Sequence, residues 1–78
     1  MTLGDLPAAH AAIVVGFQTD DPSLETRLRE IGFAEGDRVE CLYFGLFGKN
    51  PITVRLNNDL VAMRRNEAAA VIVETQNG

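Results

Sequence analysis

The sequence has few of the side chains that bind soft metal ions or form covalent crosslinks. Its 78 residues include one cysteine, Cys41, one histidine, His10, and no tryptophan. A single cysteine excludes an intrachain disulfide and favours a reducing compartment. No apolar run approaches the ~20 residues that a transmembrane helix needs. The first basic residue is Arg27, so the N-terminus lacks the positive start of a secretory signal. We therefore expect a cytoplasmic protein that does not insert into a membrane.

Positive charge is also scarce. Seven Lys and Arg residues stand against eleven Asp and Glu, which gives a formal net charge of −4. The basic residues are scattered, and only Arg64 and Arg65 adjoin. Binding to nucleic acid or to an anionic membrane surface needs clustered Lys and Arg. The composition therefore argues against both partners, and it favours a solvated strand end over a phosphate contact for Arg64 and Arg65.

The motifs of common enzymes and nucleotide-binding proteins are missing. There is no P-loop and no G-x-G-x-x-G run. The single histidine, His10, has no evident orienting partner for a catalytic triad. We expect no enzymatic activity and no cofactor.

A specific metal site is not expected, although it stays open as an alternative. His10 and Cys41 lack the spacing of metal ligands, and Cys41 fits best as a buried structural thiol. Met63 fits a gap-filling role in the core or at its rim. The alternative function is a metal-sensing or iron-carrying protein that uses His10, Cys41 and carboxylates.

The clearest local signal is a short amphipathic helix from Pro22 to Ile31. Leu24, Leu28 and Ile31 recur at helical spacing and predict an inward stripe. Asp21 suits the N-cap and proline suits the first helical position. Helix capping also explains the acidic residues 20, 21 and 25 better than a site for a hard cation does.

Two glycine turns follow this helix. If Gly32 adopts a left-handed conformation, Phe33 and Leu28 take the positions whose apolar contact completes a Schellman stop. Gly36 marks a second turn, after which the pattern changes to a period of two residues.

The remaining pattern predicts five short strands, at about residues 11–17, 38–44, 52–56, 60–64 and 71–73. Gly16 indicates a bulge in the first strand. In the second strand, one alternating set is Val39, Cys41 and Tyr43, and the other is Glu40, Leu42 and Phe44. The predicted fold is mainly β, a small five-stranded barrel with one short α-helix inserted after the first strand. We expect a single domain over residues 1–78, with residues 75–78 as a frayed tail.

The stretch between the second and third strands is unusually apolar for a loop. Three of the five aromatic residues, Tyr43, Phe44 and Phe47, lie within five positions there. The phenylalanines could fold inward and cap the barrel. Alternatively, the loop is an exposed patch of the kind that binds proteins. We predict that the loop contacts a partner through Phe44, Leu46, Phe47 and Lys49.

Several segments, in the same order and spacing, resemble the FeoA family of bacterial ferrous iron uptake. The segments are Thr2–Leu6, the helix-glycine run Leu28–Val39, Phe47–Val54, Val61–Ala68 and Val71–Val73. The chain has Glu35 where that family often has proline. The resemblance implies an SH3-like barrel, a domain that also occurs at the C-terminus of some metal-dependent repressors. It further implies a non-enzymatic cytosolic accessory protein that docks on the cytosolic face of the FeoB permease, and weak self-association is a further expectation.

Overall fold

The computed structural model describes residues 1–47 and 50–75. Within these residues the chain forms a 3-10 turn, five strands and two short α-helices. Their bounds are η1 Leu3–Asp5, β1 His10–Phe17, α1 Pro22–Ile31, β2 Arg38–Phe47, β3 Asn50–Leu56, β4 Asp59–Met63, α2 Arg65–Ala68 and β5 Val71–Thr75. Neither of these helices is long and apolar enough to cross a membrane.

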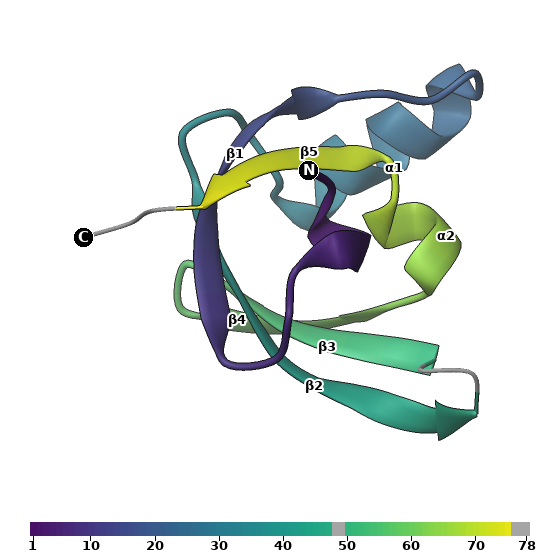
Figure 1. Cartoon of the computed structure of the whole chain (residues 1–78). Helices are drawn as coiled ribbons and strands as arrows, with labels where there is room; N and C mark the ends of the chain where they lie inside the picture. The colour runs from purple at the N-terminus through teal and green to yellow at the C-terminus, as the bar shows by residue number, and fades with distance from the viewer. Residues whose placement is uncertain (48–49, 76–78) are drawn as a thin grey trace.

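The five strands form one antiparallel sheet in the order β4-β3-β2-β1-β5. The sheet curls, so that β5 lies above and β2, β3 and β4 lie below in Figure 1. The prediction of a mainly β, barrel-like fold with a helix after the first strand is confirmed. Within the described residues the sheet is not closed, because β4 and β5 remain its two edges. The N-terminus covers part of the β5 edge, where the Val73 N–H donates to the Met1 carbonyl over 2.9 Å.

The core lies inside the curl and draws on every strand. Leu3, the first residue of η1, and Leu6, which follows η1, are fully buried. The N-terminal segment therefore contributes to the core. Cys41 and Met63 are also buried, as the sequence predicted. The other buried residues are Ala12, Val14, Leu28, Phe33, Val39, Ile52, Val54, Leu56, Ala68, Ala70, Val71 and Val73.

Helix α1 begins as its sequence predicts. The Asp21 side chain accepts a hydrogen bond from the Ser23 N–H at 2.9 Å and one from the Ser23 hydroxyl at 2.6 Å. Pro22 occupies the first turn, where a missing N–H costs no hydrogen bond. The helix therefore starts where the aspartate-proline signal predicts.

The end of α1 is a Schellman stop. Gly32 has φ +130° and its N–H donates to the carbonyl of Arg29 at 3.1 Å, while the Phe33 N–H donates to the carbonyl of Leu28 at 3.1 Å. Ile31 was expected to face inward, and this is wrong, since its side chain is 48% exposed. After the glycine turn Phe33 is buried instead, in the same core cluster as Leu28.

Two β-bulges change which side chains face the core. In β1 the register shifts between Val14 and Gly16, which confirms the bulge predicted there. In β2 the shift lies between Cys41 and Tyr43, so Leu42 is the extra residue. Strict alternation would place Tyr43 on the same face as Cys41. The bulge instead leaves Tyr43 59% exposed and places Phe44 opposite Ile52.

The predicted loop and the predicted tail are shorter in the structure than expected. The stretch 45–51 was expected to be a loop, but β2 extends to Phe47 and β3 starts at Asn50, and these two residues pair. The register shifts between Phe44 and Phe47, but the pairing of β2 with β3 continues beyond this shift. Thr75 was expected in a frayed tail but pairs with Ala12 in β1, and residues 76–78 lie outside the described residues.

Candidate partner-binding surface

The β2–β3 hairpin, where the sequence places the partner contact, has two strands in very close approach. A Cβ atom built on Gly45 would overlap the backbone carbonyl of Asn50 and the nitrogen of Pro51. Glycine is therefore required at position 45 by the space between the strands. The Asn50–Pro51 peptide bond is cis.

Of the four predicted contact residues, Phe44 has a described side chain. Phe44 is partly buried and packs against the core, on the inner side of the sheet opposite Ile52. Leu46 and Phe47 lie on the last part of β2, but their side chains lie outside the described residues, as does Lys49. The predicted contact through these residues stays a prediction. Sequence reasoning missed Tyr43 as an exposed aromatic residue, because only the bulge at residue 42 turns it outward.

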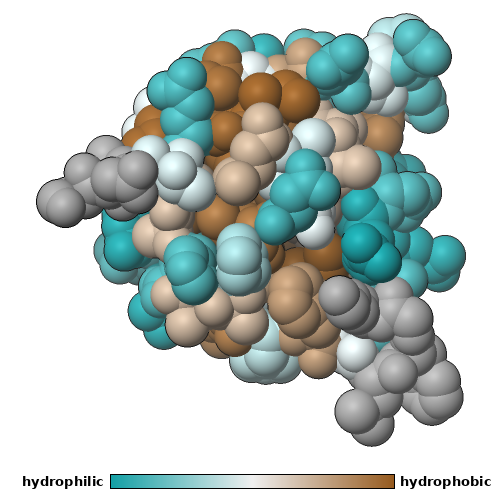
Figure 2. Space-filling model, viewed as in Figure 1, coloured by the Kyte–Doolittle hydropathy of each residue, from teal (hydrophilic) through white to brown (hydrophobic). Residues whose placement is uncertain are grey.

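A second surface feature lies on the side of the molecule where α1 and α2 approach each other. A hollow of about 470 Å³ is lined by Asp21, Leu24, Arg27, Arg64, Asn66 and Glu67. A further hollow of about 340 Å³ is lined by Asn50, Pro51 and Arg64. Because Arg64 lines both, we treat them as one groove and call it the Arg64 groove. Figure 2 shows hydrophilic side chains gathered on the side where Figure 1 places α2.

One carboxylate holds the two walls of this groove together. Oε2 of Glu67 lies 2.6 Å from Nη2 of Arg27 on α1. Oε1 of the same side chain accepts the backbone N–H of Arg64 at 2.8 Å. Glu67 therefore links α1 to α2 and also fixes the start of α2.

A separate hydrogen bond fixes α2 against the hairpin. The backbone N–H of Arg65 donates to Oδ1 of Asn50 over 2.8 Å. This bond brings the start of β3 beside the start of α2, although the two residues are far apart in the sequence. The groove thus depends on three segments that only the fold brings together.

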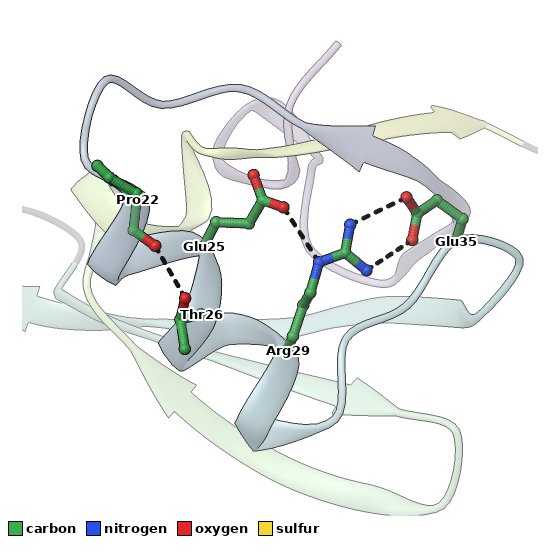
Figure 3. Close-up of polar contacts among 5 residues, drawn as sticks. All are labelled: Pro22, Glu25, Thr26, Arg29 and Glu35. Carbon is green, nitrogen blue, oxygen red and sulfur yellow. Dashed lines mark hydrogen bonds and ion pairs between the residues drawn. The ribbon is translucent and has the colours of Figure 1, made fainter.

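The outer face of α1 carries a charge network that serves the fold (Figure 3). The guanidinium of Arg29 bonds both oxygens of Glu35, at 3.0 and 3.1 Å, and Nε bonds Glu25 at 3.1 Å. It also lies 4.5 Å from the ring centre of Phe17. Glu35 and Glu25 hold the pKa of Arg29 above its ordinary value, and Arg29 lowers the pKa of Glu35. The network ties α1 to the following turn and to β1, which leaves this charge already compensated.

The two candidate metal ligands come close in the sheet but do not form a site. His10 and Cys41 are direct partners in the β1–β2 register. The Cys41 thiol is buried, and burial raises its pKa, so the metal-binding thiolate is disfavoured. His10 is exposed, and its Nδ1 lies 3.0 Å from the Ala8 carbonyl. Among the described residues no three His, Cys, Asp or Glu side chains cluster as metal ligands.

Comparison with known protein families gives a match that covers nearly the whole chain. Residues 1–75 match the FeoA domain family. The chain belongs to the FeoA family. No curated protein matches it.

Two solved FeoA structures show the same fold. FeoA from Stenotrophomonas maltophilia, an SH3 domain protein whose structure contains zinc, is 34% identical over 95% of this chain and 89% of its own, with a TM-score of 0.83. FeoA from Chlorobium tepidum is 33% identical over 100% of this chain and 72% of its own, with a TM-score of 0.87. The SH3-like fold that the sequence predicted for this FeoA-family chain is confirmed.

The same fold also occurs inside a longer regulator. A manganese-dependent transcriptional repressor is 20% identical, with a TM-score of 0.86, and the match covers 97% of this chain and 41% of the repressor. At this identity the likeness shows the fold alone.

Proposed function

We propose that this FeoA-family chain is a non-enzymatic accessory protein of bacterial ferrous iron uptake, which acts in the cytoplasm by binding a FeoB-type transporter. The observation that carries the proposal is the family match over residues 1–75. The Stenotrophomonas FeoA, similar over nearly the whole chain, is described as a candidate ferrous iron transport activating factor. An accessory that works by binding needs a docking surface rather than catalytic residues.

The features of the described surface support a binding role. The chain presents an open groove and an exposed aromatic residue, Tyr43. The net charge of −4 argues against nucleic acid as the partner. Weak self-association through the β2–β3 hairpin remains part of the proposal.

The test is recovery of the transporter from membranes. The full chain, tagged at the C-terminus beyond β5, is incubated with solubilised membranes that contain the cognate FeoB-type permease. We expect specific recovery of the permease, which excess untagged chain abolishes. If permease recovery equals that of an unrelated tagged domain of similar charge, the proposed function is wrong.

A further inference from the structure

The Arg64 groove carries positive charge that no carboxylate of the described residues neutralises in an ion pair. Four arginines of the described chain are each paired with a carboxylate: Arg27, Arg29, Arg38 and Arg55. Within residues 1–47 and 50–75, Arg64 and Arg65 form no ion pair. Arg64 is exposed and lines both hollows of the groove.

The carboxylates of the groove are already satisfied. Asp21 accepts two hydrogen bonds from Ser23, and these hydrogen bonds hold the pKa of Asp21 below its ordinary value. Glu67 binds Arg27 and the backbone of Arg64. Neither acid forms an ion pair with Arg64 in the structure, so the Arg64 guanidinium is open to a ligand from outside the chain.

From these contacts we propose that the Arg64 groove docks an extended, acidic segment of a partner protein, with Arg64 binding a carboxylate of that segment. Arginine suits this role because its planar fork bonds both oxygens of a carboxylate. Leu24 is partly buried and lines the same hollow as Asn66, whereas Asn50 and Pro51 line the other hollow. The fitting segment therefore carries a carboxylate with an apolar side chain close to it.

The shape of the groove favours a peptide over a compact ligand. One hollow is lined by residues of α1 and α2, the other by the start of β3, and Arg64 lines both. An extended chain advances about 3.3 Å per residue, so a few residues span such a groove. That this segment belongs to the transporter rests on the proposed function, whereas the preference for a carboxylate rests on the groove alone.

The test uses the uniformly ¹⁵N-labelled full chain and two blocked peptides, acetyl-Glu-Leu-Glu-Leu-Glu-amide and its counterpart with glutamine in place of glutamate. We expect the acidic peptide to shift the amide resonances of Leu24, Asn50, Arg64 and Asn66, in spite of the repulsion between two acidic molecules. The glutamine peptide should shift them far less. Arg64→Gln should weaken binding of the acidic peptide by about fivefold or more.

The matched control is Arg55→Gln, which removes an exposed arginine of β3 that lies outside the groove. It should leave the affinity for the acidic peptide unchanged. Equal binding of both peptides, or an unchanged affinity in Arg64→Gln, overturns the proposal. Two further results also overturn it: stronger shifts of the same resonances by inorganic phosphate at matched ionic strength, and shifts that grow with protein concentration without peptide, which would mean a second copy occupies the groove.

Recovery of the transporter separates this inference from the proposed function. If wild-type chain recovers the permease and Arg64→Gln recovers less, the groove is its docking site. If both recover it equally, the groove is not the transporter site, although the proposed function stands. If wild type recovers none, the proposed function fails, and the peptide titration still decides the chemistry of the groove.

Discussion

Phe33 donates its backbone N–H to the carbonyl of Leu28 across 3.1 Å, and the side chains of the same two residues are both buried. The hydrogen bond ends helix α1, and the burial of both side chains in the core cluster anchors that end. Gly32 lies between them at φ +130°, a conformation that side chains with a Cβ rarely adopt. One local motif therefore sets both the helix end and the position of a core residue.

Replacement of this glycine tests the motif. Gly32→Val should lower the free energy of unfolding by about 1–3 kcal/mol, because valine must hold a strained positive φ. Gly16→Val is the matched control, since a Cβ there meets no atom within 4 Å and needs no positive φ. Urea denaturation measures both variants. Equal losses in the two would show that the glycine conformation is not the cause.

A second glycine tests the close approach of the hairpin strands. Gly45→Ala should destabilise the protein by about 1–3 kcal/mol, because the new methyl group overlaps the backbone of Asn50 unless the strands separate. Gly16→Ala adds the same methyl group in open space and should have little effect. Thermal unfolding of both variants gives the comparison. A Gly45→Ala variant as stable as Gly16→Ala would mean that the strands are farther apart.

The N-cap of α1 predicts a pH-dependent contribution to stability. Hydrogen bonds from the Ser23 hydroxyl and N–H lower the pKa of Asp21 below its ordinary value of 3.8. A carboxyl whose folded pKa is lowered stabilises the fold above its unfolded pKa, and this stabilisation is lost as pH falls through the folded pKa. Asp21→Ala should therefore lower Tm at pH 7, and the difference from wild type should shrink below about pH 4.

The neighbouring aspartate is the control for this cap. No hydrogen bond or ion pair is formed by the Asp20 side chain within the described residues. Asp20→Ala should leave Tm nearly unchanged at pH 7 while it removes the same charge beside α1. If both variants lose the same stability, general charge near the helix start is responsible and the specific cap is not.

Titration with ferrous iron tests the metal-carrier alternative. Anaerobic titration calorimetry with ferrous iron should show no one-to-one binding of micromolar affinity, since the Cys41 thiol is buried and its raised pKa disfavours the thiolate. Cys41→Ala and His10→Ala are the controls. A one-to-one isotherm that either variant abolishes would favour the carrier function.

The hairpin contact is tested by paired truncation. Leu46→Ala combined with Phe47→Ala should weaken binding to the transporter by about tenfold or more, as loss of interface anchors does. Leu60→Ala combined with Val15→Ala truncates apolar side chains that are 65% and 41% exposed elsewhere, and it should not change binding. If the first double variant unfolds instead, these residues are core, and the docking surface lies elsewhere.

The sequence by itself determined the parts of this protein that depend on neighbouring residues. The aspartate-proline start and the glycine end of α1 follow from the chemistry of a few adjacent positions, and the structure has both. The count of strands followed from their residue patterns, and the family from the order of its motifs. These features were predictable because short-range hydrogen bonds and backbone preferences act within about one turn of chain.

Only the tertiary structure decided which side chains meet. The bulge at Leu42 exchanges the faces of Tyr43 and Phe44, since it depends on the register with β3 and not on the alternation within β2. The hairpin continues through residues that read as a loop, because ladder pairing outweighs local turn signals. From the sequence alone, Arg64 is predicted to be a solvated residue at the end of a strand. It lines a groove because two hydrogen bonds between distant segments, from Arg27 to Glu67 and from the Arg65 N–H to Asn50, hold the helices and the hairpin around it.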